Sequence, residues 1–266
     1  LSFREFLAAR AISMENWKVD SKRQSLARAE FRNYLEQGGF PRRVLTGQDI
    51  ILKELYEQIL YRDIADRFGK NLTKVIKEIS IYLLSNPSSL VSVRQVSAMT
   101  DVKNLGTVKS ILDVFESAFL FFFINKFDTS VKKQIQNPRK VYCIDTGFST
   151  ALGFRMSEDK GKLLENAIAI ELKRQGKDIF YYSDKNECDF VIRRGGSIVE
   201  AIQVCYTITK ESKEREINGL LEAMERFKIK EGNILTYDHE EKIKIKMKRI
   251  RFTPVWKWLL DLSPAI

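Results

Sequence analysis

The chain has 266 residues, 44% of them hydrophobic and 30% charged, a composition that excludes an intrinsically disordered protein. Its longest apolar run, AFLFFFI at 118–124, is too short to cross a bilayer, so we expect no membrane association. The 45 Lys and Arg residues outnumber the 35 Asp and Glu residues, and the formal net charge of +10 favours a polyanionic partner such as DNA.

The first 82 residues are predicted to be helical, because apolar residues recur at helical spacing and strand-like alternation is rare. The stretch DIILKELYEQILYRDIA at 49–65 shows this spacing most clearly. The sequence GGFPRRV at 38–44 must end a helix, since its glycines and its proline interrupt regular structure. We therefore assign residues 1–82 to a helical, lid-like segment.

Residues 83–150 are predicted to form a winged-helix domain. Helical patterns at 90–99 and 107–119 flank a polar turn, and strand-like stretches follow at 120–127 and 140–144. Two helices followed by a β-hairpin is the order of elements in a winged helix. The polar and basic stretch between the two strands is expected to form the wing.

Polar and basic side chains of this domain are candidate contacts to nucleic acid. They lie at the start of its second helix and on the wing, at Lys103, Thr107, Lys109, Lys132, Lys133, Arg139 and Lys140. Asp113 and Glu116, on the later part of the same helix, would repel phosphate. A winged helix that packs or binds protein stays open as the alternative.

Residues 151–266 are predicted to form a third domain with a mixed sheet and helices on its faces. Helical patterns occupy 163–175 and 211–227. Strand patterns are expected at 179–182, 189–192, 198–206, 234–237 and 243–252. Together with the two preceding segments, this order of elements makes the chain an α+β protein.

A dense run of basic residues, KIKIKMKRIR, occupies 242–251. Read as one strand, it places alternate lysines on one face, namely Lys242, Lys244, Lys246 and Lys248. That face is a candidate contact to phosphates. Lysines also protect an exposed edge strand from pairing with other chains, and the sequence does not distinguish these two roles.

The stretch CDFVIRRGGSIVEAIQVCY at 188–206 predicts a β-hairpin with a tight RGGS turn. Pairing of its strands brings Asp189 close to the end of the second strand, where Gln203 and Cys205 share a face. Glu165, in the preceding helix, is expected near the same point. Because a hydrolytic Mg²⁺ site uses two or more carboxylates, Asp189 and Glu165 are candidate metal ligands and Mg²⁺ is the candidate ion.

Several kinds of chemistry are missing from the sequence. No glycine-rich loop of the form G-x-x-x-x-G-K-[ST] occurs, so no phosphate-cradling loop for ATP is expected in this chain. The single histidine, His239, lies in a predicted turn and is given no catalytic role. The three cysteines show no zinc or disulfide spacing, so we interpret them as reduced thiols of a cytoplasmic protein.

A series of motifs gives the chain a family resemblance. In order, they are LSFREFL, GGFP, KVYCIDTGF, LLENAIAIEL, ECDFVI, IQVCY and FTPVWKWLL. This order resembles the C-terminal two thirds of the archaeal-type AAA ATPases, and it covers nearly the whole chain. The resemblance implies a helical lid, a winged helix and a restriction-endonuclease-like PD-(D/E)XK domain. It also implies an ATPase core that would precede residue 1, so ATP would bind only through that core.

The resemblance further implies the pattern of a nuclease site: an acid on a helix, an aspartate on one strand and Glu-x-Lys on the next. Glu165 and Asp189 match the first two positions, whereas Gln203 replaces the glutamate and Cys205 the lysine. We therefore expect a degenerate site in the DNA- or partner-docking part of an AAA-type ATPase. A Mg²⁺-dependent DNA endonuclease and a protein-interaction module that does not bind nucleic acid are the alternatives.

Overall fold

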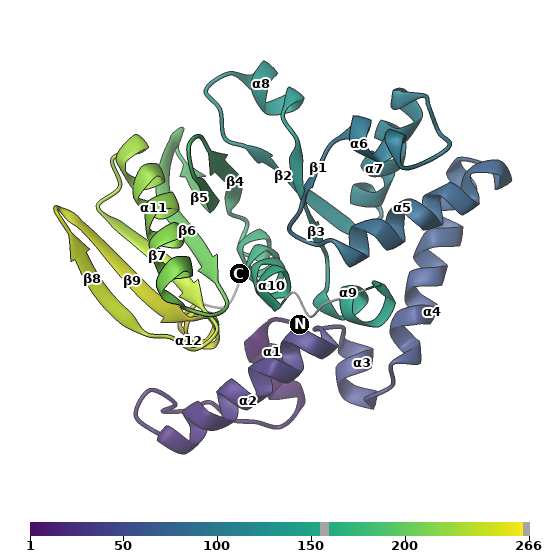
Figure 1. Cartoon of the computed structure of the whole chain (residues 1–266). Coiled ribbons are helices and arrows are strands. Elements are labelled where there is room, and N and C mark those ends of the chain that lie inside the picture. The colour runs from purple at the N-terminus through teal and green to yellow at the C-terminus, as the bar shows by residue number, and fades with distance from the viewer. Residues whose placement is uncertain (155–159, 263–266) are drawn as a thin grey trace. The chain divides into compact units, whose positions relative to one another are not determined.

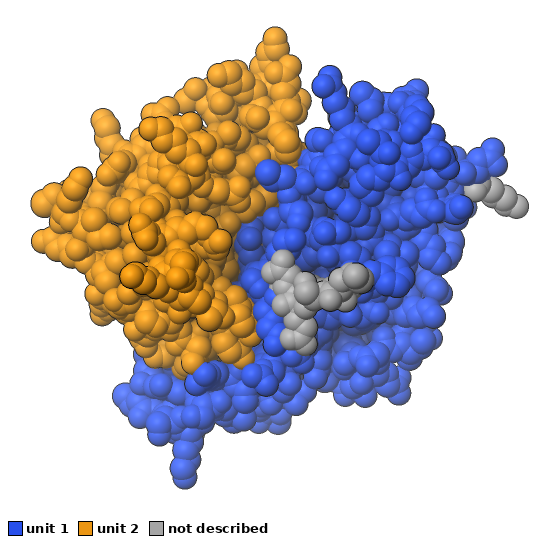
Figure 2. Space-filling model, in the orientation of Figure 1, with its two compact units in different colours: residues 1–123, 141–167 blue, residues 124–140, 168–266 orange. Residues whose placement is uncertain are grey.

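The computed structural model describes residues 1–154 and 160–262, which divide into two compact units (Figures 1 and 2). Unit 1 consists of Leu1–Phe123 and Val141–Ala167, coloured blue in Figure 2, and unit 2 of Ile124–Lys140 and Ile168–Ile266, coloured orange. Each unit is therefore built from two separate stretches of chain.

The elements form a mixed α/β protein. The helices are α1 (Phe3–Ala9), α2 (Ser21–Gln37), α3 (Pro41–Thr46), α4 (Ile50–Gln58), α5 (Thr73–Ser85), α6 (Val93–Ala98), α7 (Leu105–Ser117), α8 (Val131–Gln136), α9 (Thr146–Leu152), α10 (Lys160–Arg174), α11 (Lys210–Arg226) and α12 (Val255–Asp261). A π-helical segment, η1 (Ile59–Ile64), and two short 3₁₀ segments, η2 (Ala65–Arg67) and η3 (Lys70–Leu72), link α4 to α5. The strands are β1 (Leu90–Val91), β2 (Phe121–Lys126), β3 (Arg139–Cys143), β4 (Asp178–Ser183), β5 (Glu187–Arg194), β6 (Ser197–Cys205), β7 (Glu231–Thr236), β8 (Glu241–Ile245) and β9 (Lys248–Pro254).

The helical character predicted for residues 1–82 is confirmed. In α5, for example, Ile76, Ile79 and Leu83 are fully buried in the core of unit 1, because their spacing of three and four residues puts them on one face. The break predicted at 38–44 is also confirmed: α2 ends at Gln37, and Gly38 follows with a φ of +76°. Glycine adopts this conformation without the steric cost that a side chain brings.

A clasp in unit 1 joins two of the sequence motifs, GGFP and KVYCIDTGF. Asp145 caps α9 by accepting the Gly147 amide with Oδ1 at 2.8 Å, and its Oδ2 accepts the Gly39 amide at 2.7 Å. A Cβ atom on Gly38 would lie 1.8 Å from Asp145 Oδ1, so a side chain there would expel the carboxylate. Burial raises the pKa of Asp145 to about 6, although the two amide donors oppose that rise.

The expected pair of helices in the 83–150 segment is present as α6 and α7, and the strands β1, β3 and β2 lie side by side in that order. Asn104 begins α7 by accepting the amides of Gly106 and Thr107. The stretch between β2 and β3 differs from the expected polar wing, since it contains the short helix α8. The Ser130 side chain caps α8 by accepting the Lys133 amide. A serine at this position is a helix-start signal, but the prediction considered only that the stretch is polar and basic.

The sheet of unit 2 follows the order β2-β4-β5-β6-β7-β9-β8. β4, β5 and β6 pair antiparallel, whereas β6, β7 and β9 run parallel. The predicted tight turn between β5 and β6 is confirmed, because Gly195 and Gly196 both have positive φ and Arg194 pairs with Ser197. Helix α11 packs against β5, β6 and β7 (Figure 1) and buries Leu220, Ala223 and Met224.

The prediction of one strand at 243–252 is wrong. The chain reverses at Lys246 and Met247 and forms a hairpin, in which Lys242 pairs with Arg251 and Lys244 with Arg249. The sequence offers no glycine, proline or asparagine at this turn, and Lys246 itself adopts a positive φ of +53°. The usual composition signal for a hairpin is therefore missing.

Among the described residues, none of the helices combines the length and the apolar character that crossing a membrane requires. The division into segments 1–82, 83–150 and 151–266 stays a prediction. Its last segment includes 155–159 and 263–266, which lie outside the described residues.

Candidate functional site

Asp189, at the start of β5, lies at the centre of a buried polar network in unit 2. Its Oδ1 is 2.9 Å from the Lys140 ammonium, and its Oδ2 accepts the Val204 amide of β6 at 2.9 Å. Only 7% of Asp189 is exposed. Both carboxylate oxygens therefore have donors within the protein, as a buried carboxylate requires.

Lys140 supplies the cation of this network. It lies in β3, it is 3% exposed, and its ammonium also lies 2.7 Å from Oε1 of Glu187. The ring of Tyr181 lies beside the ammonium, with its centroid 5.9 Å away. Burial, reinforced by the charge of Glu187, raises the pKa of Tyr181 to about 12. One ammonium thus lies between two carboxylates and an aromatic ring.

Gln203, on β6, extends the network to α11. Its Oε1 accepts the Asp189 amide at 3.1 Å, and its Nε2 donates to Oε2 of Glu216 at 2.5 Å. The other oxygen of Glu216 accepts the Arg215 guanidinium. Helix α11 approaches this point closely because Gly219 has no side chain: a Cβ atom there would lie 2.2 Å from the Glu187 carbonyl oxygen.

Cys205 contributes no cation to the network. It is buried, and its Sγ donates to the Thr207 carbonyl at 3.2 Å. Burial raises the pKa of the thiol, which keeps it neutral near pH 7. The remaining predicted member, Glu165, belongs to unit 1, where its Oε1 accepts the Tyr142 hydroxyl at 2.7 Å.

The residues around Asp189 do not fit a Mg²⁺ ion. Mg²⁺ takes six oxygen ligands and is held by free carboxylate oxygens. Here both oxygens of Asp189 and the amide oxygen of Gln203 already accept hydrogen bonds. Among the described residues, no group of three or more His, Cys, Asp or Glu side chains is arranged to hold a metal ion.

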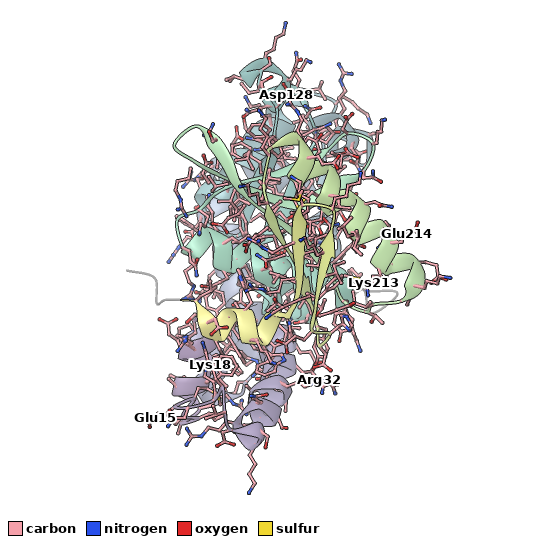
Figure 3. The ribbon with its side chains drawn as sticks, turned by 90° about the vertical axis from the view of Figure 1, so that its left-hand side faces the viewer. Glu15, Lys18, Arg32, Asp128, Lys213 and Glu214 are labelled. Atoms are coloured by element: carbon pink, nitrogen blue, oxygen red, sulfur yellow. The ribbon has the colours of Figure 1, made fainter. Side chains whose placement is uncertain are left out.

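A second candidate site is the basic face of the β8–β9 hairpin. We define it by four exposed side chains that the cross-strand pairing places on one face: Lys242, Lys244, Arg249 and Arg251. Arg249 pairs with Glu231 of β7 and lowers the pKa of that carboxyl. Figure 3 views unit 2 from the side of β8, and Lys213 and Glu214 of α11 are labelled. The Lys213 ammonium donates a hydrogen bond of 2.6 Å to Glu241, the first residue of β8.

Comparison with known proteins places the chain in a family. Residues 28–160, half of the chain, match the model of a domain of unknown function, DUF8612. The chain belongs to the DUF8612 family. Residues 160–258 match the model of a second domain of unknown function, DUF4143. Lys140 thus comes from the DUF8612 segment, whereas Asp189 and Gln203 come from the DUF4143 segment.

Two curated relatives are similar to this DUF8612 protein. An uncharacterized protein of Methanocaldococcus jannaschii is 34% identical over 98% of this chain and 62% of its own length. An uncharacterized protein of Haemophilus influenzae is 27% identical over 86% of this chain and 56% of its own length. The chain therefore spans less than two thirds of the length of these relatives. No solved structure matches it significantly.

The predicted nucleic-acid contacts of the DUF8612 segment fall into two groups. Lys103, Lys109, Lys132 and Lys133 are exposed, and Thr107 and Arg139 are half-buried. Lys140 is different, because its burial and its two carboxylate partners exclude the contact to phosphate expected of a wing residue. Its position directly after the basic stretch makes it look like a wing lysine in the sequence.

The predicted lysine stripe of the DUF4143 segment also changes. Lys242 and Lys244 keep an exposed face, and Lys246 lies in the turn. Lys248 is not an available cation of that face, because its ammonium donates to the carbonyl of Met224, in the last turn of α11, and to that of Ile229, which follows the helix. Arg249 and Arg251 take the places that Lys246 and Lys248 would have had on one long strand.

Sequence reasoning missed three members of the network. Lys140 and Glu216 are buried, whereas the side chain of Glu187 is 40% exposed. One signal could have identified the first, because Lys140 lies in β3 directly before Val141, Tyr142 and Cys143, all of which are buried. A lysine inside such a strand needs a buried counter-charge. Glu216 is harder to recognise as a buried residue from the sequence, because its neighbours in the first turns of α11 are also charged.

Proposed function

We propose that the chain is the DNA-docking part of an AAA-type ATPase, and that its nuclease-like site does not cleave DNA. The observation that carries the proposal is the basic face of the β8–β9 hairpin. Its four exposed cations lie on neighbouring strands about 5 Å apart, a spacing that lets several of them contact one phosphate backbone at the same time.

The DUF8612 segment supports docking through its order of elements. Helices α6 and α7 are followed by β2 and β3, the order of a winged helix. Two exposed lysines lie near the start of α7: Lys103 just before the helix and Lys109 in its second turn. Helix α8 takes the position of the wing and exposes Lys132 and Lys133. These side chains are candidate phosphate contacts of their own segment, separate from those of the basic face.

We expect no cleavage because both carboxylate oxygens of Asp189 already accept hydrogen bonds. A nuclease needs carboxylate oxygens free for a metal, and here they already accept hydrogen bonds from Lys140 and Val204. The parent ATPase is proposed from the resemblance of the motifs. The curated relatives extend beyond the region shared with this chain, so their length is compatible with an additional core.

The test is the salt dependence of binding to a duplex oligonucleotide, measured by fluorescence anisotropy. In the face variant, glutamine replaces Lys242, Lys244, Arg249 and Arg251. Removal of one cation that touches a phosphate should lower the slope of log K against log salt by about 0.9, so the four changes together lower it by up to about 3.6. The same protein should leave a supercoiled plasmid intact in Mg²⁺.

A matched control removes the same charge elsewhere in unit 2. In this control, glutamine replaces four residues outside the basic face, namely Lys173, Lys185, Lys210 and Arg226, all of them exposed. It should keep the native slope. Equal slopes for the native chain and the face variant, or an equal reduction in the control, would contradict docking through this face. Plasmid nicking that disappears in Asp189→Ala would contradict the inactive site.

A protein partner is the second candidate, favoured by the surface of α8. Val131 and Ile135 lie four residues apart on this helix and are 68% and 74% exposed, so one side of α8 is apolar. Asp128, labelled in Figure 3, lies just before the helix and accepts the Ser130 amide at 2.8 Å. Failure of the native chain to bind duplex DNA at low salt would favour this candidate.

A further inference from the structure

The cation at the centre of the buried network is the ammonium group of Lys140, a side chain of the protein. The Lys140 ammonium lies 2.9 Å from Asp189 and 2.7 Å from Glu187. Two carboxylates around one cation is an arrangement that proteins also use to bind divalent metals. In this site, the position between the carboxylates is filled by a side chain.

The ammonium is difficult to displace. Lys140 is 3% exposed and is tethered by β3, so it competes with free ions at a high effective concentration. A metal that displaced it would leave a buried ammonium without its counter-charges, which is strongly unfavourable. Mg²⁺ would also have to lose part of its hydration shell, which it gives up reluctantly.

The neighbouring donors reinforce this state. The Val204 N–H points at the second oxygen of Asp189, and the Asp189 N–H points at the amide oxygen of Gln203. Each of these hydrogen bonds occupies a lone pair that a metal would need. Glu216 in turn fixes the Gln203 amide through its Nε2. The backbone therefore holds the ligands in the geometry that suits an ammonium.

We propose that Lys140 takes the place of the divalent cation in this site, so that the native chain binds no metal there and removal of the ammonium creates a metal site from Asp189 and Glu187. The inference is independent of DNA docking. It is tested by metal binding, whereas the proposed function is tested by the salt dependence of DNA binding, so that either can fail alone.

The experiment is a titration of the protein with Mn²⁺, with free Mn²⁺ measured by electron paramagnetic resonance. The native chain should show no saturable site. The variant Lys140→Met, which keeps much of the length of the side chain and removes its charge, should bind one Mn²⁺ ion. In Lys140→Met with Asp189→Asn, the affinity should be at least about tenfold weaker, because the principal ligand no longer carries a charge.

Lys244→Met serves as the matched control, because it removes an exposed lysine of the same unit and should create no site. Two outcomes would overturn the proposal. One is saturable Mn²⁺ binding by the native chain that Asp189→Asn abolishes. The other is a folded Lys140→Met variant, shown by circular dichroism, that binds no Mn²⁺.

A second measurement needs no variant and covers the case in which Lys140→Met does not fold. Acetic anhydride labelling followed by mass spectrometry reports how accessible each lysine is. Lys140 should be protected relative to Lys244, and equally so with and without millimolar Mg²⁺. Labelling of Lys140 that rises on addition of Mg²⁺ would show that the metal displaces the ammonium and would overturn the proposal.

Discussion

Asp145 in unit 1 and Asp189 in unit 2 are both buried, with 8% and 7% exposure, but they are held in different ways. Asp145 accepts two backbone amides, from Gly39 and Gly147. Asp189 accepts one backbone amide and is paired with an ammonium. Amide dipoles alone do not offset burial at Asp145, whose pKa rises to about 6. The first carboxylate therefore responds to pH, and the second depends on a particular lysine.

The largest effect should come from removing that lysine. Lys140→Met leaves Asp189 buried without its cation, and breaking a buried pair in this way typically costs about 3–5 kcal/mol. Urea unfolding followed by circular dichroism measures the change in stability. The exposed Lys244→Met should change the free energy of unfolding by less than about 0.5 kcal/mol. A similar loss of unfolding free energy in the two variants would show that the buried Lys140 stabilises the fold no more than the exposed Lys244 does.

The next effect concerns Asp145 and pH. Because its folded pKa is raised, the protonated carboxyl stabilises the folded state; this contribution is complete below the ordinary pKa of 3.8 and is lost as pH rises through about 6. A rise of about two pKa units corresponds to roughly 3 kcal/mol. The free energy of unfolding, measured at pH 4 and pH 7, should therefore fall more in the native chain than in Asp145→Asn.

The sign of that difference is the decisive result. Asparagine does not titrate, so Asp145→Asn removes the pH dependence while it also places an amide group against the N–H of Gly39 or Gly147. An equal fall with pH in both proteins would mean that Asp145 keeps an ordinary pKa. The two aspartates would then not differ in the way proposed.

A smaller effect tests the packing that supports Asp189. In Gly219→Ala the new methyl group meets the Glu187 carbonyl, a backbone atom, so α11 must move away from β5. We expect a decrease of about 1–3 kcal/mol in unfolding free energy. Gly106→Ala is the control, because its nearest neighbour is the side-chain oxygen of Asn104 at 3.0 Å; it should change stability by at most about 1 kcal/mol. Equal effects would show that α11 tolerates the shift.

Much of the fold could be predicted because its signals are local. The end of α2 at Gly38 and the turn at Gly195 and Gly196 follow from the conformations that glycine alone adopts easily. The buried stripe of α11 follows from helical spacing. The turn at Lys246 could not be predicted, because lysine rarely adopts the positive φ found there and none of the neighbouring residues is typical of a turn.

The candidate site was harder to predict than the fold. The pairing of Asp189 with the end of β6 follows from the hairpin, since both strands and their turn are contiguous in sequence. Lys140 meets Asp189 across 49 residues, and no local pattern records such a contact. The resemblance of the motifs implies only that Cys205 stands where a cation is expected, whereas in the structure Lys140 of β3 pairs with Asp189.

The assembly of each unit from two stretches of chain has a consequence for cleavage of the backbone. Residues 124–140 belong to unit 2, although unit 1 continues from 141 to 167. A single protease cut after the exposed Gly176, in the turn between α10 and β4, would therefore place Lys140 on one fragment and Asp189 on the other. Their buried contact, together with the pairing of β2 with β4, would keep the two fragments of a nicked chain associated until it is denatured.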